Sequence, residues 1–185
     1  MIYEVHITVA EGQGAPYLFG TKTIRLELES GKNRVQTLVG AKEEFSNDTD
    51  AIAWTFDLER ELVRRGYKLA RRKLEAPLLD YQDKTPLYSE AHWKFEFKKI
   101  SDVFKFEEFR RTEEKHDAGY LLSWSLDKKD KAWLTKRFYG DHKYARSFFS
   151  RSNAEIQHNF PIPPVHFEAV IVDTNLDLDE GWVAK

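Results

Sequence analysis

The chain has 185 residues, 41% of them hydrophobic and 32% charged, and its formal net charge at pH 7 is −2. This balance argues against a bulk electrostatic attraction to nucleic acid and leaves a local basic patch open, and the lack of cysteine excludes disulfides, zinc–thiolate centres and a cysteine nucleophile. No apolar run approaches the ~20 residues of a membrane-spanning helix and no signal-peptide pattern opens the chain, so the expected location is a reducing cytoplasm.

The sequence pattern of residues 1–80 predicts four strands and one helix. The predicted strands, which alternate between apolar and polar side chains, are residues 2–10, 21–29, 34–41 and 67–79. Residues 11–20, with three glycines and Pro16, predict a loop with at most one helical turn. A helix is expected from Asn47 or Asp48 to about residue 65, because apolar residues recur at helical spacing and Gly66 follows the last turn.

Residues 81–185 predict a similar order after a polar linker. The predicted strands are residues 90–99, 119–126, 131–139 and 165–173. Helices are expected to begin near Ser101 and at Asp141, both of which can cap a helix N-terminus. The chain closes with an acidic tail that contains Trp182.

Two sequence patterns recur in both halves. The pattern of residues 2–9 recurs in residues 90–95, and that of residues 73–80 recurs in residues 166–173. Each half therefore begins with a strand that carries a histidine and ends with a strand that carries a glutamate. We interpret this as a duplication. It predicts an α+β fold of two tandem ferredoxin-like (βαββαβ) halves, residues 1–80 and 81–185, each an antiparallel sheet in the order 4-1-3-2 with helices on one face. The alternative is a single continuous sheet curled into a barrel or tunnel.

The predicted strand order places chemically active side chains side by side. His6 would neighbour Glu75, and His92 would neighbour Glu168, all on the face that carries no helices. Thr8, Lys94 and His166 share the parity of these residues. Such a face collects the groups used in acid–base catalysis and phosphate binding. The alternative interpretation is an ordinary solvent-exposed face, which antiparallel sheets often have.

The segment His6-Ile7-Thr8-Val9 resembles the histidine–hydrophobic–threonine–hydrophobic strand of the two-histidine phosphoesterases. In that family two such strands face each other across a cleft, each histidine moves a proton, and each threonine holds the phosphate of a 2′,3′-cyclic or 2′–5′ bond. The resemblance implies His6 and His92 as catalytic residues, although Lys94 stands where the second threonine is expected. The predicted substrate-binding residues are Thr8, Lys94, Glu75, Glu168 and His166.

Two further resemblances concern other parts of the chain. It looks like an uncharacterised group of bacterial proteins that open with a similar histidine–threonine strand and end in a segment like 175–182; this implies no activity, but suggests that Trp182 packs on a sheet edge or helix. Charged strands that could face a lumen also resemble the triphosphate-tunnel enzymes. Where that family has an opening strand with the pattern glutamate–x–glutamate–x–lysine, this chain has Glu4-Val5-His6-Ile7-Thr8.

The sequence therefore predicts a cleft that binds a phosphorylated small molecule or an RNA end and that could hydrolyse a phosphodiester. The alternatives are a non-catalytic module that binds a ligand or protein or forms a homodimer, and a triphosphate-tunnel-like phosphohydrolase. A metal site is not predicted, because the candidate ligands lack the tight spacing of a metal motif, and no cofactor is indicated. Those candidate ligands are His6, His92, His166, Glu75 and Glu168.

Overall fold

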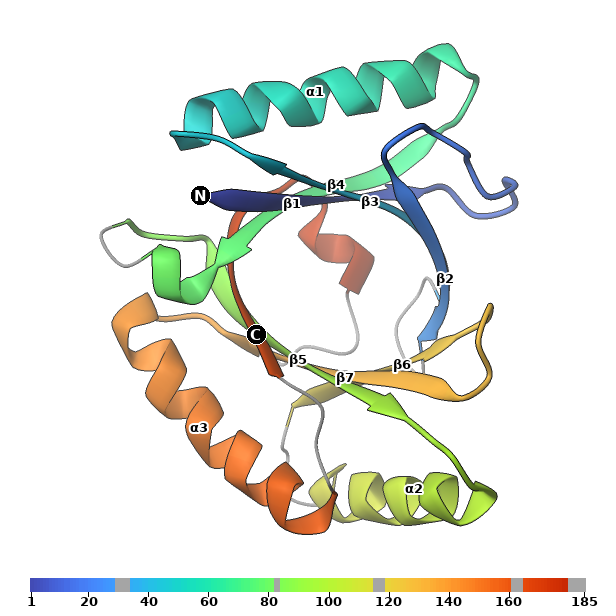
Figure 1. Cartoon of the computed structure of the whole chain (residues 1–185), viewed down its shortest axis with the longest axis vertical. Helices are drawn as coiled ribbons and strands as arrows, with labels where there is room; N and C mark the ends of the chain where they lie inside the picture. Colours follow the sequence, from blue (N-terminus) through green and yellow to red (C-terminus); the bar gives the residue numbers. More distant parts are fainter. Residues whose placement is uncertain (29–33, 82–83, 115–118, 161–164, 180–185) are drawn as a thin grey trace.

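The strands of the computed structural model close into one antiparallel barrel, with helices on its outside (Figure 1). The structure describes residues 1–28, 34–81, 84–114, 119–160 and 165–179. The strands are β1 (Ile2–Val9), β2 (Lys22–Leu28), β3 (Val35–Glu44), β4 (Leu69–Pro77), β5 (Tyr88–Glu96), β6 (Tyr120–Ser125), β7 (Lys131–Phe138) and β8 (Val165–Asp173). The helices are α1 (Asp48–Arg64), α2 (Ile100–Glu114) and α3 (His142–Asn159), with short 3-10 helices η1 (Leu78–Asp80) and η2 (Leu176–Asp179). Around the barrel the strand order is β1-β3-β2-β6-β7-β5-β8-β4.

The predicted tandem ferredoxin-like α+β fold is wrong. The edge strands of the two expected sheets pair with each other, β4 with β8 over five residue pairs and β2 with β6 over three, so both halves of the chain share one mainly β barrel. Closure removes the sheet edges that two separate open sheets would expose. The first half also lacks a helix between β1 and β2, since Gly12 and Gly20 adopt positive φ in the connecting loop. The observed fold corresponds to the alternative of one continuous sheet curled into a barrel.

The local signals for helices and strands were better guides than the fold prediction. Asn47 caps α1, accepting a 2.9 Å hydrogen bond from the backbone N–H of Asp50, and Gly66 follows α1 with φ of 89°. Asp141 caps α3, as predicted, and β8 has the predicted bounds. None of the helices in the described ranges has both the length and the apolar character needed to cross a membrane. The predicted packing of Trp182 lies outside the described residues.

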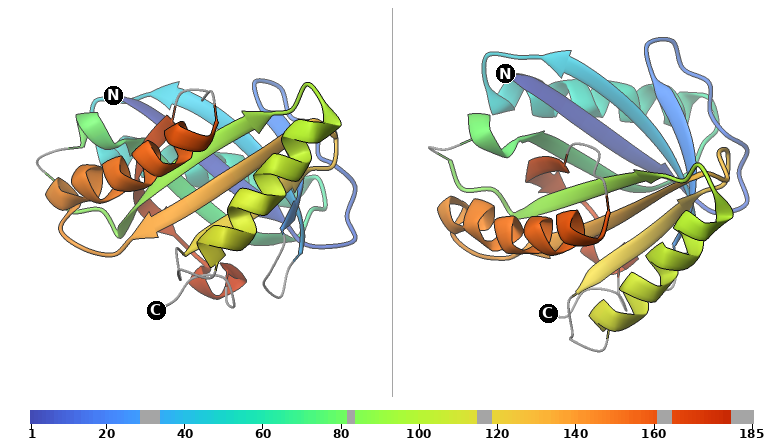
Figure 2. Two further views of the ribbon diagram at one scale, coloured as in Figure 1. Left: turned by 90° about the horizontal axis from the view of Figure 1, so that it is seen from below. Right: turned by 60° about the horizontal axis from the view of Figure 1, so that its bottom comes forward.

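The apolar core lies between the outer face of the barrel and the helices. Tyr3, Val5 and Ile7 of β1 are almost fully buried, in one cluster with Leu62 of α1. Burial of each such large side chain contributes about 1.5–3 kcal/mol. Figure 2 shows α2 and α3 on the outside of the second-half strands. Because side chains alternate along a strand, the opposite parity faces the barrel interior.

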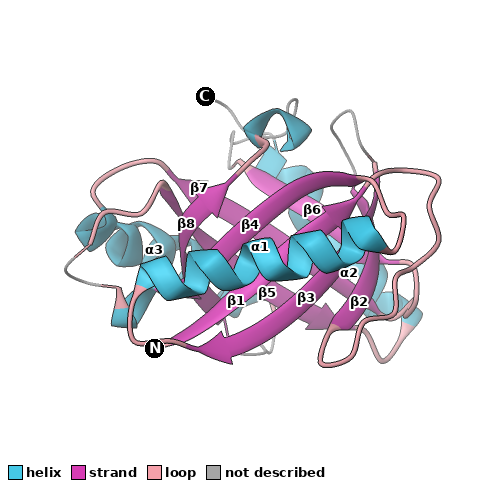
Figure 3. Ribbon diagram, turned by 90° about the horizontal axis from the view of Figure 1, so that it is seen from above, coloured by secondary structure: helices cyan, strands magenta, loops and turns pink. Residues whose placement is uncertain are grey.

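The two ends of the barrel differ. One end is where β4 begins and β8 ends, and η2 lies across it: it appears within the ring in Figure 1 and beyond the strands in Figure 3. The segment before η2 is fixed to β4, because Asn175 Nδ2 donates to the Ala70 carbonyl and the Arg72 N–H donates to Thr174 Oγ1, both at 2.9 Å. Leu178 of η2 is buried. We call the opposite end, where β1 and β8 begin, the open end.

Candidate functional site

Charged side chains from adjacent strands meet inside the barrel. β5, β8, β4 and β1 are neighbours, and their ladders place Glu4 beside Glu75 and Glu90 beside Glu168 on the inner face. We define the inner charge network as Glu4, His6, Lys73, Glu75, Glu90, His92, Arg137 and Glu168.

His6 lies between two carboxylates of the first half of the chain. Its Nδ1 is 3.0 Å from Glu75 Oε2, and its Nε2 is 3.1 Å from Glu4 Oε1. Burial lowers the pKa of His6, but Glu75 and Glu4 outweigh that effect and raise the pKa to about 9. The imidazole is therefore a cation at neutral pH.

His92 occupies the equivalent place in the second half. Its Nε2 is 3.0 Å from Glu168 Oε2 and 3.2 Å from Glu90 Oε2. Burial again lowers the pKa, and the carboxylates of Glu168 and Glu90 raise it to about 10. Each half thus holds an imidazolium between the glutamate two residues before it and a glutamate of the last strand.

The two imidazoles differ in the residue that faces them on the neighbouring strand. His92 pairs in register with Thr135 and donates from Nδ1 to its Oγ1 at 2.8 Å, which leaves only Nε2 for the carboxylates. His6 pairs with Gly40, where an added Cβ would lie 3.3 Å from His6 Cδ2. Glycine therefore leaves room for the ring and provides no competing acceptor, so both nitrogens of His6 reach carboxylates.

Lys73 joins the two halves of the network. Its Nζ lies 2.5 Å from Glu75 Oε1 and 2.7 Å from Glu90 Oε2, and Arg137 also pairs with Glu90. Burial alone would raise the pKa of Glu75, but Lys73 and His6 lower it to about 2. The pKa of Glu90 is held well below its usual range against burial, chiefly by Lys73 and Arg137. A continuous series of ion pairs therefore connects one imidazole with the other.

Solvent reaches the network from the open end. Beneath η2, the Asp173 side chain is fully buried and accepts hydrogen bonds from Arg71 and, at 2.5 Å, from the Tyr88 hydroxyl. His6 and His92, in the middle of their strands, are 26% and 22% exposed. Lys42 of β3, near the open end, is 63% exposed. Accessibility thus increases away from η2, which makes the imidazoles the deepest groups of the network that solvent contacts appreciably.

The structure brings together some of the residues predicted from the sequence and separates others. His6 contacts Glu75, and His92 contacts Glu168, as the predicted neighbouring strands required. Thr8 shares the inner face but is buried beside Arg71 in register. Lys94 pairs with Glu96 at 3.0 Å near the end of β5, and His166 is exposed at the start of β8, opposite His92.

The site predicted from the sequence did not include several members of the network, namely Glu4, Lys73, Glu90 and Arg137. A signal for two of them was present, because both histidines follow a glutamate by two residues, in Glu4-Val5-His6 and Glu90-Ala91-His92. Residues two apart on a strand point to the same face, so each pair had to share the interior. Arg137 carried no comparable signal, because its position depends on the pairing of β7 with β5.

The network contains donors that suit a divalent cation. Glu75, Glu90 and His92 each offer one ligand atom, and these atoms lie within 4.8 Å of one another. Carboxylate and imidazole are common ligands for zinc, iron and manganese. The Lys73 ammonium already lies between the two carboxylates, however, and a metal would have to displace it together with the proton of His92. The arrangement is an ion-pair network with its own internal cation.

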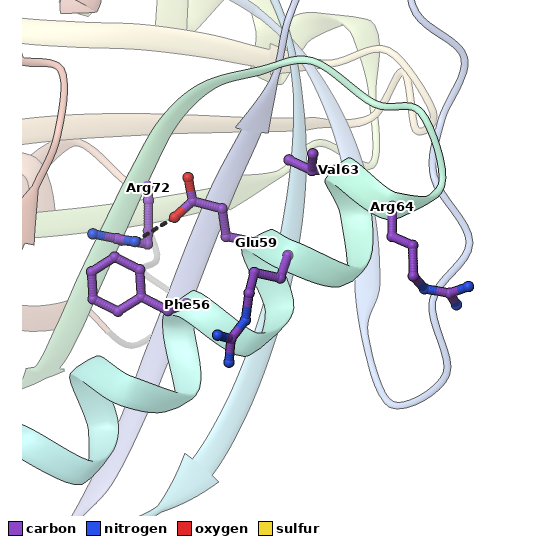
Figure 4. A pocket seen from close by; sticks show the side chains of 6 residues that line it. Phe56, Glu59, Val63, Arg64 and Arg72 are labelled. Carbon is purple, nitrogen blue, oxygen red and sulfur yellow. Dashed lines mark hydrogen bonds and ion pairs between the residues drawn. The ribbon is translucent and has the colours of Figure 1, made fainter.

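A second candidate is a groove on the outer surface between α1 and β4 (Figure 4). It is lined by Phe56, Glu59, Arg60, Val63, Arg64 and Arg72. The Arg72 guanidinium lies 3.8 Å from the centroid of the Phe56 ring and pairs with Glu59. The other arginines pair with acidic residues of the same helix. Because its charges are compensated locally, we do not assign a ligand to this groove.

No protein-family model matches the chain, and no curated protein or solved structure matches it. The resemblances to two-histidine phosphoesterases, to triphosphate-tunnel enzymes and to the bacterial group therefore rest on the sequence motifs alone. The interior geometry has to carry any functional argument.

Proposed function

We propose that the barrel interior binds a phosphorylated small molecule that reaches it from the open end. The observation that carries this proposal is the pair of partly exposed imidazolium groups, one from each half, on the same inner surface. Charged N–H donors form short, strong hydrogen bonds with phosphate oxygens. An eight-stranded barrel has an interior of the size that holds side chains or one small ligand.

The charge distribution favours an anion at the open end. The network has four carboxylates and four cations, and Lys42 adds a cation 2.5 Å from Glu4. Lys94 and Lys131 share the inner face near the same end, where both pair with Glu96. The carboxylates fix the cations in place, and the surplus positive charge lies where solvent enters. A phosphate there would contact Lys42 and would have to replace Glu4 at His6 Nε2 and a carboxylate at His92 Nε2, because each imidazolium N–H already has a protein acceptor.

Binding is separable from hydrolysis at this site. A histidine that acts as a general base must be unprotonated near the operating pH. The neighbouring carboxylates hold the pKa of His6 near 9 and that of His92 near 10, so both are protonated at pH 7. Two-histidine phosphodiester hydrolysis, which needs one imidazole as a base, is therefore not part of the proposal, and ligand binding is.

Isothermal titration calorimetry at pH 7 and low salt tests this function. The ligands are inorganic pyrophosphate, tripolyphosphate and a 2′,3′-cyclic nucleotide, and the second of these also addresses the triphosphate-tunnel alternative. We expect a dissociation constant below about 1 mM for at least one ligand, weakened at least tenfold in the double variant His6→Gln/His92→Gln. His158→Gln, an exposed position on α3, is the matched control and should bind normally.

Two results would contradict the proposal. One is that none of the three ligands binds, and that a phosphate ester of an aliphatic chain does not bind either. The other is that the double variant, shown by circular dichroism to be folded, binds as well as the parent protein. Turnover of the cyclic nucleotide that depends on both histidines would instead show that the site is catalytic and that one imidazole loses its proton on binding.

A further inference from the structure

The inner face of the barrel has an apolar wall opposite the charges. It consists of Ile24, Leu26 and Leu28 of β2, Leu38 of β3 and Leu121 of β6, and the buried polar side chains of Gln36, Ser123 and Ser125 share this part of the inner face. Register fixes their orientation: Leu38 pairs with Thr8 and Ile24, while Leu121 pairs with Thr135, the inner-face neighbour of His92. In the ring of strands, β2 stands across from β8 and β3 across from β5, the strands of Glu168 and His92.

The apolar wall is separate from the core beneath the helices. Val39 and Leu122, the outward neighbours of Leu38 and Leu121, belong to that core. The five wall residues are not part of its cluster of described residues. Leu28 and Leu121 are buried, whereas Ile24, Leu26 and Leu38 are only partly buried although they face inward. An apolar ligand that covers this aliphatic surface removes it from water, and this burial contributes favourable free energy to binding.

The wall extends away from the open end. β2 begins at Lys22, which is exposed at the level of His6, and ends at Leu28 toward the η2 end. Apolar residues therefore follow the cations along the direction in which a ligand would enter. The buried Leu178 of η2 lies across the far end.

We propose that the ligand is an amphiphile, a phosphate or diphosphate ester of an aliphatic chain. This rests on the proposed function and specifies its ligand class. The phosphate head contacts His6, His92 and Lys42, and the chain lies along Leu26 and the rest of the apolar wall toward η2. Branched aliphatic side chains complement a flexible hydrocarbon chain, whereas nucleobases bind preferentially by stacking on aromatic rings. Trp133 of β7 also faces inward, so a nucleotide serves as the comparison ligand.

The test compares ligands that share a head group. Geranyl diphosphate, inorganic pyrophosphate and ADP are titrated into the unmodified protein at pH 7 in a calorimeter. We expect geranyl diphosphate to bind at least tenfold more tightly than pyrophosphate and more tightly than ADP. Leu26→Gln is expected to weaken geranyl diphosphate binding at least fivefold and to leave pyrophosphate binding unchanged. Leu79→Gln, at an exposed position on η1, is the matched control.

The outcomes separate this inference from the function on which it rests. If geranyl diphosphate and pyrophosphate bind with equal affinity, and both depend on the histidines, the proposal of an amphiphilic ligand is wrong and the proposal of a phosphate site stands. Tighter binding of ADP than of geranyl diphosphate overturns it in favour of a nucleotide. If pyrophosphate and geranyl diphosphate both fail to bind, the two proposals fall together. The ligand comparison uses the unmodified protein, so it does not depend on the folding of Leu26→Gln.

Discussion

Replacement of Lys73 by methionine tests whether the inner charge network links the two halves of the barrel. Lys73 Nζ lies within 2.7 Å of carboxylate oxygens of both Glu75 and Glu90, and both glutamates are fully buried. Methionine keeps an unbranched side chain of similar length but removes the charge that separates the two carboxylates. Removal of one partner of a buried ion pair costs about 3–5 kcal/mol. For a chain of this size, that lowers the melting temperature by roughly 10 °C.

The effect is measured by urea unfolding followed by circular dichroism at pH 7 and pH 4. Lys42→Met is the matched control: Lys42 also pairs with a glutamate, but it is 63% exposed, so we expect its loss to cost less than about 1 kcal/mol. In the parent protein Lys73 and His6 hold the pKa of Glu75 near 2 against burial, so this carboxylate stays charged at pH 4. Without Lys73 the pKa values of Glu75 and Glu90 rise, and a proton relieves their repulsion as the pH falls.

The free-energy gap between parent and Lys73→Met should therefore be smaller at pH 4 than at pH 7. Two findings would refute the reasoning. One is a gap at pH 7 no larger than that of Lys42→Met. The other is a gap that stays constant with pH, which would mean that the buried carboxylates are not charged or not in contact with the ammonium.

Three further predictions concern single positions. Above pH 6.5 the imidazoles of the unfolded chain lose their protons, whereas those of His6 and His92 in the native network keep theirs up to pKa values of about 9 and 10. The free energy of unfolding should therefore fall from pH 6.5 to 10, by at most about 1.4 kcal/mol per pH unit per histidine. His92→Gln should flatten this slope in urea unfolding, and an unchanged slope would argue against a charged His92. Gly40→Ala should cost about 1 kcal/mol and shift the imidazole resonances and pKa of His6 in NMR titrations, since the new Cβ lies 3.3 Å from the ring; an unperturbed His6 titration would contradict the close contact. Gly66→Ala should cost about 1 kcal/mol in thermal unfolding because φ is 89°, whereas Gly14→Ala, a loop glycine with open space around it, should have little effect; equal effects would refute the backbone argument.

Much of the local structure could be predicted because it depends on sequence patterns within a few residues. The alternation in β1 and β8 and the cap at Asn47 depend only on residues close in sequence. The pairing of the first and last strands of each half joins residues far apart in sequence, and it was predicted from the expected strand order 4-1-3-2 within each half. This is why the contacts His6–Glu75 and His92–Glu168 could be anticipated.

The closure of the barrel could not be predicted in the same way. The β4–β8 and β2–β6 ladders join strands from different halves, and an open sheet and a closed barrel require the same alternation of side chains. The position of Lys94 illustrates the consequence for the site: the motif suggested a phosphate ligand beside His92, but the residue pairs with Glu96 near the strand end. Lys73 became central only once both halves shared one interior.

The ladder between β2 and β6 is the shortest in the barrel as described, with three residue pairs from Leu26–Ser125 to Leu28–Ser123, whereas β1 and β3 share eight. Local opening takes the least free energy where the fewest backbone hydrogen bonds must break. Amide hydrogens along this seam should therefore exchange first with solvent. Parting there would unroll the ring into one continuous sheet hinged on β4 and β8, with the apolar wall divided between its two free edges.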